Sequence, residues 1–171
     1  MRRLLSIYVR INDAISVVIL ALGAVIVGFA VVALFSGAVE RYVSGIGYAW
    51  LDDMPPMLLP WAVFPILGVL IRSDRHIAVE VLPTMLRGRA RTLLRLAVYL
   101  VCLAAALTFF WAGVDAVAFF RELGEVSESE IEFPIWTMYL SFPVGFGLLA
   151  NFSLEAALKE GWRLCGGEGE G

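Results

Sequence analysis

Long apolar stretches alternate with short charged segments along this chain. Four stretches contain no Asp, Glu, Lys, Arg or His, and they cover residues 14–39, 54–71, 96–114 and 133–154. A helix needs roughly 17–25 predominantly apolar residues to cross the hydrocarbon core of a bilayer. Each stretch therefore predicts one transmembrane helix. The first is longer than a crossing requires, so we expect that helix to be tilted.

The overall composition supports this pattern. Of the 171 residues, 60% are hydrophobic and 17% are charged, and the mean hydropathy is +0.84. Soluble domains carry about 25% charged residues. The chain is therefore predicted to be an all-α integral membrane protein, with a single four-helix membrane domain over residues 1–163. The glycine-rich residues 164–171 are expected to form a disordered tail.

The distribution of positive charge predicts the orientation in the membrane. Of the 13 Lys and Arg residues, all except Arg41 and Arg121 lie before the first stretch, between the second and third, or after the fourth. Loops rich in Lys and Arg remain on the cytoplasmic side. Both termini are therefore expected to be cytoplasmic, and the more acidic loops on the opposite side are expected to face the periplasm.

Local signals mark the expected helix ends. Asn12 or Asp13 is expected to cap the first transmembrane helix. Asp52 and Asp53 precede Pro55, which is typical of an N-terminal helical turn, where acidic side chains are favourable and proline is tolerated. These signals place the second helix start close to the acidic pair.

Few polar features lie inside the four apolar stretches. Asn151 is the strongest polar group there and is expected to form a hydrogen bond with a neighbouring helix. Two small-residue pairs, Ala24/Gly28 and Ser141/Gly145, would permit close helix approach. A pump or carrier that moves its solute alone usually has ionisable residues within its spans. The absence of such residues favours a protein that depends on a partner.

The second stretch is rich in proline. Pro60 and Pro65 remove N–H donors and would free the carbonyls of Pro56 and Trp61. A helix broken in this way forms the substrate site in many transporters. Because no charged or amide side chain lies nearby, we favour a kink that packs against protein.

The charged segment after the second stretch contains the single histidine of the chain. If residues 76–82 are helical, Arg72, His76 and Glu80 recur at a spacing of four residues and share one face. A cluster of arginines follows at residues 87–95. An amphipathic segment followed by basic residues is typical of the membrane interface, where arginines contact the phosphates of phospholipids.

Three motifs together resemble one known family. They are ERYVSGIGYAWLDD at 40–53, WAVFPILGVLIRSDRHIAVEVLP at 61–83 and FPIWTMYLSFPVGFGLL at 133–149. Their order and spacing resemble the small membrane subunit, DctQ-like, of tripartite ATP-independent periplasmic (TRAP) transporters. The resemblance suggests partner or lipid interface roles for nine residues: Arg41, Trp50, Asp52, Asp53, Arg72, His76, Glu80, Trp136 and Pro143.

The resemblance also implies a division of labour in the bacterial inner membrane. A periplasmic solute-binding protein captures an organic acid, and a large transmembrane transport subunit moves it with the energy of an ion gradient. The small subunit is then a non-catalytic scaffold, with phospholipids as further partners and without nucleic acid, metal or cofactor. The additional prolines Pro60 and Pro65, and the pair Asp52-Asp53 where glutamate is frequent, leave the transported solute open.

A second hypothesis treats the chain as a membrane-anchored redox or enzyme subunit built around His76. One histidine cannot supply two haem ligands, and the two cysteines show no metal-type spacing. A single histidine beside arginines is also a poor site for a cation. We therefore expect no catalytic, metal or cofactor-binding residues, and the scaffold hypothesis is favoured.

Overall fold

The computed structural model describes residues 2–72, 89–127 and 132–164. In this part the chain is helical, with α1 at Arg2–Ser44, α2 at Ala49–Arg72, α4 at Arg89–Leu123, α5 at Ile135–Tyr139 and α6 at Ser141–Leu164. Four helical segments are long and apolar enough to cross a membrane: α1, α2, α4, and α5 taken together with α6. The predicted all-α membrane architecture is confirmed. The expected interfacial segment with His76 and Glu80, and the expected tail from residue 165, lie outside the described residues.

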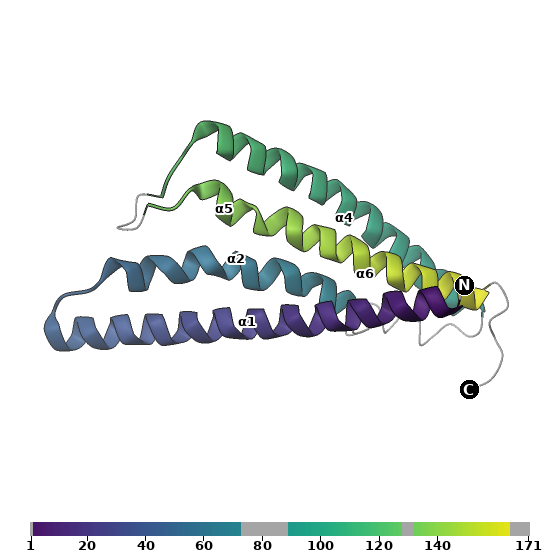
Figure 1. The fold of residues 1–171 in the computed structure, drawn as a ribbon, viewed down its shortest axis with the longest axis horizontal. Helices are drawn as coiled ribbons and strands as arrows, with labels where there is room; N and C mark the ends of the chain where they lie inside the picture. The colour runs from purple at the N-terminus through teal and green to yellow at the C-terminus, as the bar shows by residue number, and fades with distance from the viewer. Residues whose placement is uncertain (1, 73–88, 128–131, 165–171) are drawn as a thin grey trace.

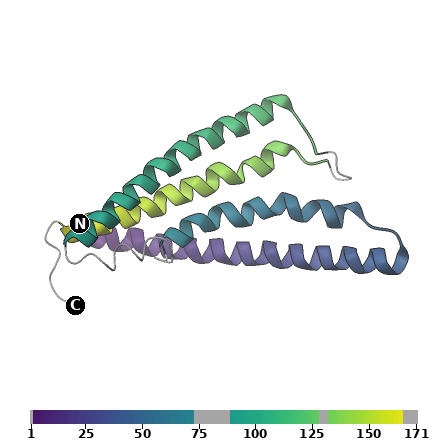
Figure 2. The same ribbon diagram turned by 180° about the vertical axis from the view of Figure 1, so that it is seen from behind.

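The helices stand side by side in a single row instead of a closed bundle (Figures 1 and 2). Helix α1 packs on α2, α2 packs on α6, and α6 packs on α4. Over most of their length the outer helices α1 and α4 pack on one side only, and the most apolar part of α4 contains almost no buried residue. Such exposure is costly in water, but it suits a protein surrounded by lipid.

The row is a fan that narrows toward one end (Figures 1 and 2). At the convergent end lie the start of α1, the end of α2, the start of α4 and the end of α6. At the splayed end the hairpin of α1 and α2 diverges from the hairpin of α4 with α5 and α6.

Helix α1 is much longer than one membrane crossing. Its 43 residues correspond to roughly 65 Å at about 1.5 Å per residue, about twice the thickness of the hydrocarbon core. The prediction that Asn12 or Asp13 caps this helix is wrong, because α1 starts at Arg2 and continues through both residues. The first ten residues extend the helix before the apolar stretch and place Asn12 beside the other helices.

Left-handed glycines end two of the helices. Gly45, with a φ of 71°, follows α1, and its N–H donates to the Arg41 carbonyl at 3.1 Å. Gly124, with a φ of 64°, follows α4 in the same conformation. Glycine adopts this conformation without the steric cost that a Cβ imposes. Each glycine therefore stops a long helix and lets the chain turn toward its neighbour.

Prolines affect the two central helices differently. Helix α2 continues without interruption through Pro55, Pro56, Pro60 and Pro65, so the helix is not broken as a substrate-binding helix would be. The fourth apolar stretch is interrupted instead, at Leu140 between α5 and α6. Pro143 accounts for this interruption, since it supplies no N–H to the carbonyl four residues earlier and its ring crowds that carbonyl.

Glycines allow α6 to approach its two neighbours closely. A Cβ on Gly145 would collide with Phe64 of α2, lying 2.6 Å from its carbonyl carbon. A Cβ on Gly113 of α4 would lie 3.0 Å from Cδ of Pro143. Close backbone approach increases van der Waals contact, which drives helix association where lipid removes the hydrophobic advantage. The expected close approach is confirmed at Gly145, whereas among the described residues Gly28 has no other helix close to it.

Replacing Gly145 with Ala should weaken the packing of α2 on α6. Overpacking of this kind costs about 1–3 kcal/mol, because the obstructing atoms belong to the Phe64 backbone and cannot rotate away. Thermal unfolding in detergent, followed by circular dichroism, measures the loss. Gly28→Ala is the matched control, since a Cβ on Gly28 meets nothing within 4 Å. Equal stability of the two variants would contradict the close packing.

Candidate functional site

A buried carboxylate joins three helices at the convergent end. Glu155 of α6 is 1% exposed and accepts a hydrogen bond from Asn12 Nδ2 of α1 at 2.6 Å. Arg72 Nε, at the end of α2, lies 3.3 Å from Oε2 and 3.4 Å from Oε1. Lys159, one helical turn further along α6, donates to Oε1 at 2.5 Å. A buried charge persists only when partners replace its lost hydration.

Arg72 uses its whole guanidinium group to connect α2 with α1. Its Nη2 donates to Asp13 Oδ1 at 2.6 Å and to the Val9 carbonyl at 3.2 Å. Its Nη1 donates to Ser16 Oγ at 3.1 Å. The guanidinium carbon also lies 5.9 Å from the centre of the Phe152 ring. Arginine suits such a position because its planar fork offers several donors in fixed directions.

Amide and hydroxyl groups extend this network toward the membrane. Asn151 Nδ2 donates to Asn12 Oδ1 at 2.9 Å, and Tyr8 Oη donates to Asn151 Oδ1 at 2.7 Å. Both bonds connect α1 with α6 across more than a hundred residues of sequence. The prediction that Asn151 bonds to a neighbouring helix is confirmed. We call these residues, with Glu155 and Arg72 at their centre, the polar staple: Tyr8, Asn12, Asp13, Ser16, Arg72, Asn151, Glu155 and Lys159.

The charges of the polar staple balance. The cations Arg72 and Lys159 face the carboxylates of Asp13 and Glu155. Because the carboxylates are already paired, the staple offers no free base or nucleophile. Among the described residues, no three His, Cys, Asp or Glu side chains lie where they could share a metal ion. The arrangement is suited to holding helices together.

A second ion-pair group attaches α4 at the same end. Glu160 of α6 is 5% exposed, with Arg163 Nη1 at 2.8 Å and Arg95 Nη1 of α4 at 3.7 Å from its Oε1. Through the staple and Glu160, all four long helices are connected by charged groups at the convergent end. No comparable connection spans the two hairpins among the described residues of the splayed end.

Four of the residues that were predicted to lie at interfaces meet at the α1–α2 turn. Arg41 forms an ion pair with Asp52 and packs against Gly47, whose added Cβ would lie 3.2 Å from Arg41 Nε. Trp50 is 41% exposed, and Asp53 is half-buried nearby in α2. Arg41 and Asp52 thus hold their own hairpin turn, and Trp50 keeps much of its surface available.

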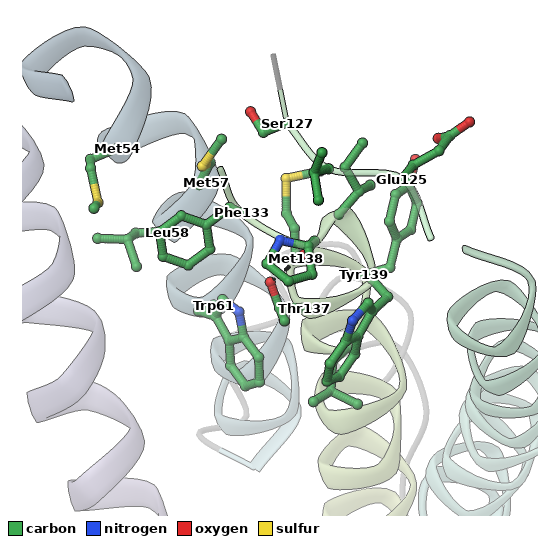
Figure 3. Close-up of a pocket in the computed structure, with 15 residues that line it drawn as sticks. Met54, Met57, Leu58, Trp61, Glu125, Ser127, Phe133, Thr137, Met138 and Tyr139 are labelled. Atoms are coloured by element: carbon green, nitrogen blue, oxygen red, sulfur yellow. Dashed lines mark hydrogen bonds between the residues drawn. The ribbon is translucent and has the colours of Figure 1, made fainter. Parts of the chain in front are cut away.

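An apolar pocket of about 830 Å³ lies between the hairpins at the splayed end. Met57, Leu58 and Trp61 of α2 face Phe133, Met138 and Tyr139 across it, as Figure 3 shows. Trp136 also lines the pocket, and the guanidinium carbon of Arg121 lies 5.7 Å from the centre of the Trp136 ring. The pocket lies where the hairpin of α1 and α2 diverges from the hairpin of α4, α5 and α6.

The remaining predicted residues have separate positions. Pro143 is buried at the start of α6, against α4. Arg72 lies in the polar staple, and Trp136 lies in the pocket. His76 and Glu80 fall outside the described residues, so their shared face stays a prediction.

Sequence reasoning missed Glu155 as a partner of Arg72, and it missed Asn12 and Lys159 as partners of Glu155. Asn12, Glu155 and Lys159 lie just outside the apolar stretches and were not proposed as interface residues. The available signal was the position of opposite charges: Asp13, Arg72 and Glu155 each directly flank an apolar stretch on the same predicted side of the membrane. Residues at the same depth on adjacent helices can pair, whatever their distance in sequence.

Replacing Glu155 with Gln should destabilise the chain by about 3 kcal/mol, because breaking a buried ion pair leaves Arg72 and Lys159 without their central partner. Glutamine keeps the side-chain length and one acceptor oxygen, so the loss of stability measures mainly the effect of removing the negative charge. The free energy of unfolding in mixed detergent micelles measures it. Glu122→Gln, at an exposed carboxylate of α4, is the control and should change stability by less than about 0.5 kcal/mol. If both substitutions lowered the free energy of unfolding equally, the polar staple would not be what stabilises the fold.

Comparison with known proteins gives one family. Residues 30–163 match the sequence model of the DctQ component of tripartite ATP-independent periplasmic transporters. The chain is also 28% identical over 120 residues to the uncharacterized protein y4mM of Sinorhizobium fredii (strain NBRC 101917 / NGR234). That alignment covers 70% of this chain but 22% of the relative, so the chain spans about a fifth of that protein's length. No solved structure matches the chain.

The family match covers α2, α4, α5 and most of α6, together with about the last third of α1. It therefore includes Arg72 and Glu155 of the polar staple and every residue of the apolar pocket. On the basis of this match and its four membrane-spanning helices, the chain belongs to the DctQ family, the small membrane component of TRAP transporters.

Proposed function

We propose that this chain is a non-catalytic scaffold that supports the large transport subunit of a TRAP system in the bacterial inner membrane. Members of the DctQ family work with a large membrane subunit and a periplasmic binding protein. In this proposal the large subunit moves a carboxylate-type organic solute with the energy of an ion gradient. The small chain supplies a surface that stays fixed while the transport part moves.

The pairing of the charged groups carries this proposal. An ion or solute pathway needs ionisable or amide groups that face a cavity. In the described part of the chain, the buried carboxylates Glu155 and Glu160 are both engaged by cations. The large pocket is lined mainly by methionine, leucine and aromatic side chains, and the carboxylate of its lining residue Glu125 points away from it in Figure 3.

The single-row architecture supports a partner-dependent role. A row of four helices has two broad faces and two edges, and apolar side chains of α1 and α4 are exposed along it. Phe35 and Val25 of α1 and Val101 of α4 are more than 60% exposed. One face can pack on a large membrane subunit while the other contacts lipid. Charge clusters keep the row together when it has no partner on either face.

The position of the basic residues supports an orientation with both termini in the cytoplasm. Arg10, Arg72, Arg95 and Lys159 all belong to the convergent end, which also carries the N-terminus (Figure 1). Arg41 and Arg121 belong to the splayed end. The positive-inside rule then directs the convergent end to the cytoplasm and leaves the splayed end toward the periplasm, where a binding protein docks.

Reconstitution tests the scaffold proposal. Liposomes that contain this chain alone should show no ion-driven uptake of organic acids, whereas liposomes with the chain, its large subunit and the binding protein should. Liposomes with the large subunit but without this chain are the second arm and should transport poorly. Uptake by this chain alone would refute the proposal.

Substitution of Glu155 in the full system separates assembly from solute recognition. Glu155→Gln should lower the yield of complex with the large subunit and the maximal uptake rate in proportion, because the fan is less stable. The apparent KM for the solute should stay within about twofold of the wild type, since the staple lies away from any solute path. A raised KM with a normal yield of complex would place Glu155 in transport instead.

A further inference from the structure

The apolar pocket at the splayed end has the properties of a lipid site. We propose that it binds one phospholipid from the membrane leaflet that surrounds the splayed end, with an acyl chain in the pocket and the phosphate near Arg121. This inference goes beyond the proposed scaffold function and does not depend on it.

The walls are suited to an acyl chain. The volume of about 830 Å³ is in the range of roughly 300–1,000 Å³ that is typical of small-molecule pockets. Met57 and Leu58 on one side, and Met138 on the other, offer flexible or branched apolar surfaces (Figure 3). Methionine adapts readily to a flexible apolar ligand. An empty apolar space of this size inside a bilayer fills with the hydrocarbon around it.

Two polar donors in the pocket have no acceptor among the described residues. Trp61 and Trp136 both line the pocket and are half-buried, and neither indole N–H donates a hydrogen bond to the described residues. Half-buried indoles usually find an acceptor, and tryptophan is favoured at the depth of lipid headgroups. The ester and phosphate oxygens of a phospholipid are acceptors at that depth.

A cation is held beside the same pocket. The guanidinium group of Arg121 stacks over the Trp136 ring at 5.7 Å, and it forms no ion pair with the described carboxylates. The carboxylate of Glu125 points away from the pocket in Figure 3. A positive group next to an apolar pocket at a membrane boundary is the arrangement that retains lipid phosphates.

A phospholipid satisfies all three features at once. A transmembrane helix of a partner could fill the apolar volume, but its backbone groups are already paired and offer no acceptor to the indoles. A small organic acid could pair with Arg121, but it would leave the methionine and aromatic walls unfilled. A phospholipid brings an acyl chain, ester oxygens and a phosphate together, and it is the most abundant molecule around the protein.

Native mass spectrometry of the purified complex with its large subunit tests the proposal. The wild-type complex should retain a phospholipid that Met57→Trp removes, because the larger side chain fills the pocket. Leu59→Trp is the matched control, since Leu59 lies on the same helix, is 39% exposed and does not line the pocket. Equal lipid retention by the two tryptophan variants would overturn the proposal.

Titration of the delipidated complex tests the phosphate contact separately. Arg121→Gln should weaken phosphatidylglycerol binding roughly tenfold, as expected for one charged hydrogen bond, and should leave diacylglycerol with the same acyl chains unaffected. Arg10→Gln, at an exposed arginine of the convergent end, should change neither affinity. If Arg121→Gln lowered the affinity for phosphatidylglycerol and for diacylglycerol equally, Arg121 would not contact the phosphate. Lipid that binds the isolated chain but not the complex would show that the partner occupies the pocket.

Discussion

The structure depends on the burial of one carboxylate at the edge of the membrane. Glu155 is almost completely buried, and in a low-dielectric environment that position is tolerable only with partners on several sides. Arg72, Asn12 and Lys159 supply those partners from three helices. The cost of leaving any of these groups unpaired fixes the positions of α1, α2 and α6 relative to one another. Apolar packing in lipid lacks this directional character.

The same constraint explains the shape of the molecule. The convergent end is held by the polar staple and by Glu160, whereas the splayed end has a hairpin turn closed by Arg41 and Asp52 but no ion pair between hairpins in the described residues. The two hairpins can therefore diverge away from the staple, and the apolar pocket forms where they do. Gly145 keeps the two hairpins in contact midway along the row, and Gly113 brings α4 close to α6 within its own hairpin. A fan with one fixed end presents broad apolar faces, which is consistent with a family that acts beside a large membrane subunit.

Much of this architecture could be predicted from the sequence, because the cost of charge in hydrocarbon is strong and local. The four apolar stretches, the hydrogen bond of Asn151 and the close approach at Gly145 followed from composition and spacing. The pairing of Arg72 with Glu155 did not, since it connects residues far apart in sequence whose shared depth becomes evident only when the helices are packed. The helix cap at Asn12 was predicted wrongly. The prediction placed the start of the helix at the start of the apolar stretch, whereas α1 begins at Arg2. The pocket follows from divergence of the helices, for which the sequence carries no local signal.

The central claim is that this chain stays rigid while its partner moves, and one distance measurement tests it directly. Spin labels at Tyr42 of α1 and Phe119 of α4, both strongly exposed, report the distance between the two hairpins near the splayed end. Electron–electron double resonance on the reconstituted complex compares the resting state with the state under an ion gradient, solute and binding protein. A fixed scaffold predicts one narrow distance distribution that is the same in both states. A shift or a second population during transport would contradict it.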